Sequence, residues 1–289
     1  MSDFLNDLQR ATIQKLTADG ARFDAGGDLR ALLQAYYTVK ERRIEPRVRS
    51  VHRAPEFDVA VAQLNIAEQT AASVIGQKCL AGDDINGHLS LRSLQPDARD
   101  ELLVDWRIHH LHLSLSPHPS DARFLERSGP LAFGHVTDTD VYLLTILDHG
   151  NWSDRNLFEI LVRRFPEAVE SFELRGVTPD LSITDEVIRA CRACGAAYAF
   201  PVDGKSYRPP SFAGSNSLSH RAYQRAEQAI REVTKLENAV TLNMQKIISQ
   251  VPIFSGLGAL DLELVVETEE WLVREKTTGQ VFRINYDGE

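Results

Sequence analysis

The sequence predicts an α+β fold, because the spacing of its apolar residues changes along the chain. Apolar residues recur at helical intervals through the first hundred residues, whereas from Trp106 they alternate with a period of two, which is typical of strands. A long helical pattern begins near residue 220, and three short alternating segments follow it. We therefore expect four regions: a helical region with a basic run over 1–100, an α+β candidate catalytic domain over 101–210, a Ser/Gly loop and long helix over 211–255, and a small β-meander over 256–289.

The composition is that of an ordinary globular protein. The chain has 289 residues, of which 43% are hydrophobic and 25% charged, and its net charge is −9. Its three cysteines are too few, and odd in number, for a disulfide framework. No apolar stretch approaches the ~20 residues of a membrane helix, and the acidic N-terminal segment is unlike a secretory signal. These observations predict a cytoplasmic protein that does not act in a membrane.

The first hundred residues are expected to be helical. The first helix begins at Ser2 and stops at Gly20. The second runs from about Asp28 to Arg43, and Pro46 limits its extension. A third, rich in alanine, spans Asp58–Leu80.

The central segment is predicted to form a mixed or antiparallel sheet with flanking helices. The expected strands are Trp106–Leu115, the hairpin Leu131–Thr137 with Val141–Asp148, and a second hairpin, Ala196–Val202 with Lys205–Arg208, which turns at Asp203-Gly204. The expected helices run from Ser153 to Pro166 and from Thr184 to Cys194.

The C-terminal segment is predicted to contain a mobile loop, a helix of some thirty residues and a β-meander. The loop is Ser211–Ser219, and the meander strands are Leu260–Thr268, Trp271–Lys276 and Gln280–Tyr286. The long helix carries a heptad-like seam, in which Asn243 fills one position; the other members are Ala222, Ala226, Ala229, Val233, Leu236, Val240 and Ile247. The seam either packs on its own domain or pairs with a second copy, and the second alternative predicts a homodimer through Ala222–Ile247.

Three of the nine histidines lie within four positions of the strand that follows Trp106. Alternation places His110, His112 and Ser114 on one face, and His109 on the other with three leucines. The leucines mark the core side, so His110 and His112 are expected to face a cleft or solvent. They could ligate a metal, divide acid and base roles, or merely decorate the sheet edge.

Two further groups are candidates for the same site. His149 lies in Asp148-His149-Gly150-Asn151, where a strand ends and a helix begins, and a helix start favours anions such as phosphate. Arg127 precedes the hairpin and could supply a fixed cation, although most loop arginines have no such role. Asp148 and Asn151 could instead simply cap the turn. Without an acidic metal site, His110, His112, His149 and Arg127 together favour phosphodiester cleavage that needs neither a metal nor another cofactor.

A basic run stands out against the acidic background of the chain. Its arginines, which are candidate contacts to nucleic-acid phosphates, are Arg42, Arg43, Arg47, Arg49 and Arg53. Alternatively, the run is a solvated face or pairs with acidic residues elsewhere.

One region resembles a recurrent group of bacterial hypothetical proteins. The resemblance covers about residues 82–166 and rests on Trp106-Arg107-Ile108-His109-His110-Leu111-His112-Leu113, on Arg127-Ser128-Gly129-Pro130-Leu131 and on His149-Gly150-Asn151-Trp152. It implies a bacterial origin and a single module, and it transfers no reaction. A compact sheet with basic and imidazole groups is also similar, by architecture alone, to small RelE-like ribonuclease toxins.

The sequence favours a bacterial enzyme that acts on nucleic acid, RNA more than DNA. In this hypothesis a metal-independent ribonuclease, used as a toxin or against phage, has His110 or His112 as general base and His149 as general acid. Arg127 would stabilise the charge that develops on the phosphate. The alternative is a non-enzymatic regulatory protein that binds nucleic acid or another protein.

Overall fold

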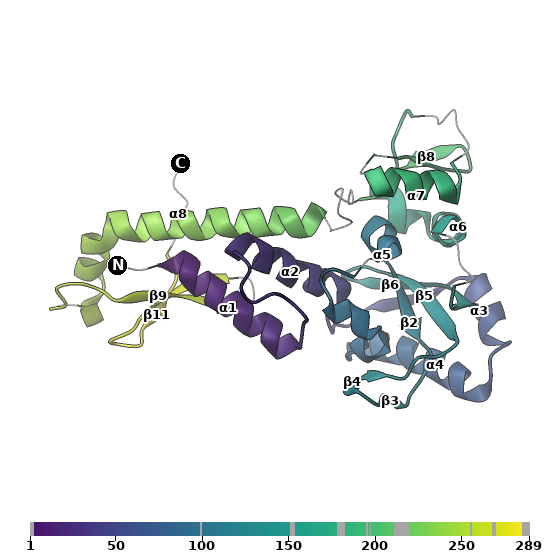
Figure 1. Ribbon diagram of the computed structural model, residues 1–289, viewed down its shortest axis with the longest axis horizontal. Helices are drawn as coiled ribbons and strands as arrows, with labels where there is room; N and C mark the ends of the chain where they lie inside the picture. Colours follow the sequence, from purple (N-terminus) through teal and green to yellow (C-terminus); the bar gives the residue numbers. More distant parts are fainter. Residues whose placement is uncertain are drawn as a thin grey trace. The chain divides into compact units, whose positions relative to one another are not determined.

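The computed structural model in Figure 1 describes residues 3–98, 100–150, 154–177, 183–194, 196, 198–210, 220–254, 256–267 and 270–284. The chain forms two compact units. Unit 1 comprises Met1–Val39, Leu94–Pro96 and Arg221–Glu289, and unit 2 comprises Lys40–Ser93 and Asp97–His220. Unit 1 therefore combines segments that are distant in the sequence, whereas the two segments of unit 2 are nearly continuous.

Unit 1 is built around the long helix α8 (His220–Gln250), which runs alongside α1 (Phe4–Asp19) in Figure 1. The N-terminus of α1 is capped by the Asp3 side chain, one residue after the cap expected from the sequence, and Gly20 ends it in the left-handed conformation (φ 71°). The antiparallel sheet β11-β10-β9 completes the unit and confirms the predicted meander. Its strands are β9 (Leu262–Glu267), β10 (Glu270–Glu275) and β11 (Val281–Phe282); α2 (Leu29–Arg42) and η4 (Pro252–Phe254) are the other helical segments.

The predicted seam of α8 lies inside unit 1. Six of its residues are at most 2% exposed: Ala222, Ala226, Ala229, Val233, Leu236 and Val240. Five of them, all but Ala222, share one core with Phe4 and Leu8 of α1 and with Leu264 of the meander. Asn243 is exposed and donates to the Ala239 carbonyl of its own helix (2.8 Å). The seam packs on its own unit, which removes the basis for a homodimer through Ala222–Ile247.

Unit 2 contains a four-stranded sheet of order β1-β6-β5-β2. The first strand runs parallel to β6, and the other neighbours are antiparallel. The predicted hairpin is confirmed as β5 and β6. The strands are β1 (Ser50–Arg53), β2 (Ile108–His112), β5 (Pro130–Val136) and β6 (Asp140–Asp148), with β3 (Pro117–His118) and β4 (Asp121–Leu125) forming a separate pair.

Both faces of this sheet are covered. On one face, Ile108 and Phe133 join a large core in which the ring of Trp106 stacks on Phe158 (centroids 3.7 Å apart). On the other face, Leu111 is also fully buried. The helical segments of unit 2 are α3 (Pro55–Val61), α4 (Ile66–Ala81), η1 (Asn86–His88), η2 (Leu91–Leu94), α5 (Glu101–Trp106), α6 (Asp154–Arg164), η3 (Pro166–Phe172) and α7 (Asp185–Cys194).

Two local predictions for unit 2 are confirmed. The second hairpin joins β7 (Phe200–Val202) to β8 (Lys205–Tyr207), with Asp203 and Gly204 both at positive φ (48° and 78°) as a tight hairpin requires. Helix α7 also forms, and its Arg192 donates to Asp105 of α5 (2.6 Å). Both of these side chains are buried, so the pair fixes α7 against α5.

Other predictions for the first 115 residues are wrong. The strand β1 interrupts the expected helical region, and the third helix is two helices, because Asn65 starts α4 with a capping box to Glu68. Trp106 ends a short helix, and β2 begins after Arg107, which is left-handed (φ 54°).

Some predictions fall outside the described residues: the caps Ser2 and Ser153, the loop Ser211–Ser219, and the end of the meander beyond residue 284. Of the helices in the described part of the chain, none combines the length and apolar character needed to span a membrane.

Candidate functional site

The edge strand β2 places its histidines alternately on the two faces of the sheet. His110 lies opposite Phe133 of β5, and His112 lies opposite Leu131. This is the face that carries the large core of unit 2, and the His112 side chain is only 3% exposed. The expectation that both histidines face a cleft or solvent is therefore wrong for His112, because the core covers that end of the strand. His110 keeps 27% of its side chain exposed.

The hydrogen bonds of His112 define its chemical form. Its Nδ1 accepts from the backbone N–H of Ser128 (3.4 Å), so the proton of the neutral ring lies on Nε2. Burial, reinforced by the nearby charges of His110, Arg127 and His149, lowers the pKa of His112 to about 4. At neutral pH His112 is thus an uncharged ring with Nε2–H as a donor, which suits it to stabilise an anion and not to remove a proton.

The loop before β5 holds the other candidate groups beside His112. Ser128 Oγ accepts from the Leu113 N–H (2.7 Å) and donates to the Pro130 carbonyl (2.6 Å), which fixes the loop on β2. The backbone N–H of His149 donates to the Gly129 carbonyl (3.1 Å), which ties the end of β6 to the same loop.

These bonds hold His112, the end of β6 at His149 and the loop that carries Arg127 at one end of the sheet. Arg127 immediately precedes Ser128, and both Arg127 and His149 are exposed. His110 contributes a partly exposed ring from the middle of β2, and its Nδ1 lies 4.0 Å from Asp100. The result is a cluster in which two imidazoles, those of His110 and His149, and the guanidinium of Arg127 lie near the neutral ring of His112. Asn151, part of the predicted anion-binding turn, lies outside the described residues.

Two arginines of the basic run make structural contacts within unit 2. The guanidinium of Arg49 donates to the carbonyls of Thr137 (2.7 Å) and Glu45 (2.8 Å), and that of Arg42 donates to the carbonyl of Ala98. Both side chains are buried, and burial lowers the pKa of each. Their contacts fasten the segment that precedes β1 to the rest of unit 2.

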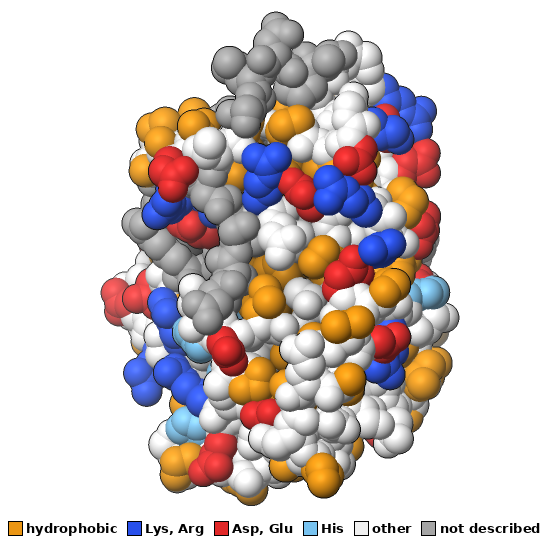
Figure 2. All heavy atoms as spheres, turned by 90° about the vertical axis from the view of Figure 1, so that its right-hand side faces the viewer, with side chains coloured by type: hydrophobic (Ala, Val, Ile, Leu, Met, Phe, Trp, Pro, Cys, Tyr) orange, Lys and Arg blue, Asp and Glu red, His pale blue; other side chains and the backbone are white. Residues whose placement is uncertain are grey.

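Arg47 and Arg53 of the basic run are paired with nearby carboxylates. Arg47 pairs with Glu45, and Arg53 pairs with Asp58 (2.5 Å). In Figure 2, Lys and Arg side chains are interspersed with Asp and Glu side chains over the visible face. These contacts follow the alternative of paired charges, and nucleic-acid binding by Arg42, Arg43, Arg47, Arg49 and Arg53 stays a prediction.

Three residues of the site were missed by the sequence analysis: Ser128, Asp100 and His88. Ser128 holds the His112 ring, and His88 Nδ1 bonds the His112 carbonyl (2.9 Å). A serine beside the predicted Arg127 was the only available signal, since His88 and Asp100 are brought close to β2 by the fold alone. Within the described ranges, no group of three or more His, Cys, Asp or Glu residues is arranged to hold a metal ion.

Comparison of the chain with family models, with curated proteins and with solved structures found no match.

Proposed function

We propose that unit 2 is a ribonuclease that cleaves RNA by histidine acid–base chemistry without a metal ion. One observation carries the proposal. His110, His112, Arg127 and His149 come from β2, the loop before β5 and the end of β6, and the Ser128 and Gly129 bonds hold these segments together. Imidazoles beside a guanidinium combine proton transfer near neutral pH with stabilisation of an anionic phosphate.

Because His112 carries its proton on Nε2, it acts as a hydrogen-bond donor in this proposal. The base and acid roles therefore fall to His110 and His149. His110 removes the proton of the ribose 2′-hydroxyl as its oxygen attacks the adjacent phosphorus, and His149 protonates the leaving 5′-oxygen. The products are a 2′,3′-cyclic phosphate and a 5′-hydroxyl end. Arg127 and the Nε2–H of His112 stabilise the negative charge on the phosphate oxygens during the transfer.

The proposal is tested by RNA cleavage with excess chelator present. Alanine at His110, His149 or Arg127 is expected to reduce the rate by about 10²-fold or more, as loss of an acid, a base or a charge-stabilising group does. A 2′-deoxy substitution at the cleaved nucleotide is expected to stop the reaction, because the nucleophile is then missing. The matched controls are His118→Ala, on β3, and Arg175→Ala, which is 76% exposed and pairs with Glu170.

The role of His112 has its own readout. His112→Asn retains an N–H donor and is expected to lose less activity than His112→Ala, and neither variant is expected to change the pH profile above pH 5. Full activity of the His110→Ala, His149→Ala double variant contradicts the proposal. Salt-sensitive RNA binding without any cleavage would support a regulatory binding protein instead.

The proposal extends to the cell as a toxin or phage-defence effector that acts in a bacterial cytoplasm. Induced expression of the wild type is then expected to arrest growth of a bacterial host, and the His149→Ala variant at equal abundance is expected to be harmless.

A further inference from the structure

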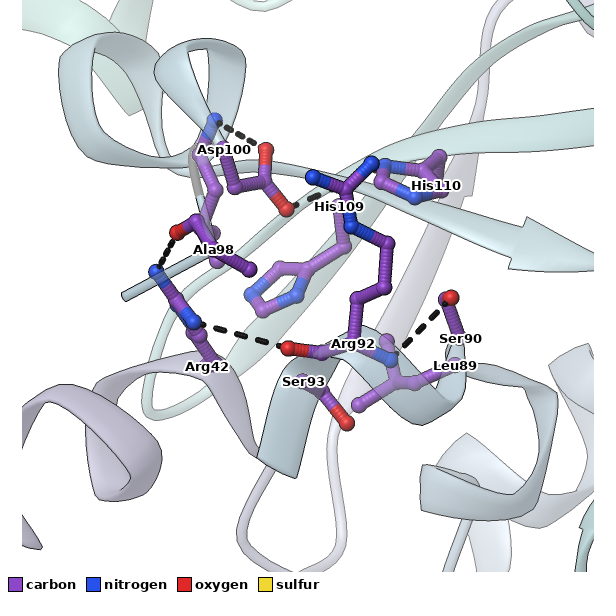
Figure 3. A pocket seen from close by; sticks show the side chains of 10 residues that line it. Arg42, Leu89, Ser90, Arg92, Ser93, Ala98, Asp100, His109 and His110 are labelled. Carbon is purple, nitrogen blue, oxygen red and sulfur yellow. Dashed lines mark hydrogen bonds and ion pairs between the residues drawn. The ribbon is translucent and has the colours of Figure 1, made fainter. Parts of the chain in front are cut away.

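A small cavity lies beside His110 in unit 2. Its volume is about 70 Å³, and it opens between β2, the short helix η2 and the start of α5. Figure 3 shows its lining, which combines two leucines with charged and polar groups; the residues that carry the argument below are Leu89, Arg92, Asp100, Leu103, His109 and His110.

The floor of the cavity presents the ring of His109. This side chain is 6% exposed, and in Figure 3 its ring projects into the space between Arg42 and Arg92. Burial lowers its pKa to about 3, so the ring is neutral and offers one N–H and one lone pair. No hydrogen bond joins this ring to another residue in the described part of the chain. The ring nitrogens are not among the buried atoms that lack a partner, so they remain open to a hydrogen bond with a ligand in the cavity.

The mouth of the cavity carries opposite charges side by side. Asp100 uses Oδ1 to cap the Leu103 N–H (3.2 Å), and its Oδ2 lies 4.0 Å from His110 Nδ1. The exposed side chain of Arg92 extends toward the same carboxylate in Figure 3. The mouth therefore offers a carboxylate acceptor next to the cationic guanidinium of Arg92.

This lining matches a nucleobase. The edge of a base carries adjacent donors and acceptors, which Asp100, Arg92 and His109 complement, and its flat apolar faces suit Leu89 and Leu103. A phosphate group matches less well, because Asp100 would repel it. On the scale where a water needs roughly 10–15 Å³, the cavity holds about five to seven waters. That space favours a single-ring base over a purine.

We infer that this cavity binds a pyrimidine base of the RNA substrate, next to the phosphate that is cleaved. The inference rests on the proposed function, because His110 both lines the cavity and acts on the ribose in that proposal. It assigns substrate specificity to Asp100, Arg92 and His109.

Calorimetry with the four nucleoside 3′-monophosphates and the full chain tests this inference. A pyrimidine nucleotide is expected to bind at least tenfold more tightly than either purine nucleotide. Asp100→Asn is expected to reduce this preference to below threefold, since an amide retains the helix cap but alters the donor–acceptor pattern. Arg92→Ala, an exposed substitution, is expected to weaken binding as well. Asp83→Asn makes the same charge change at an exposed position outside the cavity and is expected to leave the preference intact.

Equal affinity for all four nucleotides, tighter purine binding, or an unchanged preference in Asp100→Asn would overturn the inference. These nucleotides have no bond for the proposed reaction to cleave, so binding is measured independently of activity. A pyrimidine preference in a protein that never cleaves RNA would overturn only the proposed function.

Discussion

Four histidines in unit 2 are kept neutral by their surroundings. Burial is the first cause in each case, and it lowers the pKa of His109 to about 3, of His112 and His135 to about 4, and of His88 below its usual value. His135 also bonds the Trp106 carbonyl through Nδ1 (3.0 Å). Protonation of these four rings in acid is therefore unfavourable in the folded protein.

The protein is therefore expected to lose stability as the pH falls from about 6.5 toward 4. In this window the unfolded chain binds protons at these histidines and the folded chain does not, so the free energy of unfolding rises with pH and levels off above about 6.5. Each unit of pKa difference is worth about 1.4 kcal/mol. Urea unfolding between pH 5 and 7 measures the slope above the range in which carboxylates titrate.

His135→Gln is expected to flatten this slope, and His118→Gln, which alters a histidine on β3, is expected to leave it unchanged. A free energy of unfolding that stays constant or falls with rising pH over this range would contradict the assignment of neutral buried rings.

The residues of the candidate site were identified from the sequence, but the environment of His112 was not. Strand alternation correctly places His110 and His112 on one face and His109 on the other. The error was to take that face as open, on the grounds that leucines marked the opposite side. Alternation reveals burial only where one face of a sheet is solvated, and here core residues such as Phe133 and Leu111 cover both.

Elements with a strong local signal were predicted well. The long helix α8 and the Asp203-Gly204 hairpin follow from spacing and turn chemistry alone. The strand β1 has four residues with no alternating burial, and its parallel partner β6 lies about ninety positions later in the chain. Such a strand is specified by tertiary pairing, which a local pattern does not contain.

The break between α3 and α4 illustrates the same limit within one helical segment. Apolar spacing continues across it, whereas the chain turns at Asn65, whose side chain accepts from the Glu68 N–H (2.9 Å) while the Glu68 carboxylate accepts from the Asn65 N–H (3.3 Å). The reciprocal bonds supply partners for two of the N–H groups at the start of α4.

Asn65→Ala is expected to lower the free energy of unfolding by about 1 kcal/mol, because the cap of α4 is lost. Thermal or urea unfolding followed by circular dichroism measures the change. Gln63→Ala, an exposed substitution in the same turn, is expected to change stability by less than about 0.5 kcal/mol. Equal effects of the two substitutions would show that the capping box does not define this helix start.

At the scale of the whole molecule, the chain does not fold as consecutive regions. Unit 1 joins the N-terminal helix α1 to α8 and the C-terminal meander, through Phe4 and Leu8 on one side and Leu264 on the other. Asp7 of α1 also accepts from the Leu264 N–H (2.8 Å), across more than 250 positions of sequence. The sequence pattern predicts the apolar seam of α8. Only the three-dimensional structure shows that other residues of the same chain pack against it.

Leu236 and Leu242 lie on the same helix. Substitutions at these two positions distinguish packing of the seam within unit 1 from pairing of two copies. Leu236 is 0% exposed in the core of unit 1, whereas Leu242 is 84% exposed. Leu236→Glu is expected to destabilise unit 1 by more than about 4 kcal/mol, because it buries an unpaired charge, and Leu242→Glu is expected to be nearly neutral. Unfolding followed by circular dichroism, with the sedimentation coefficient of each variant, tests both statements. If Leu236→Glu instead yields a fully folded protein of half the wild-type mass, the seam joins two copies, and the packing of α8 described here is wrong.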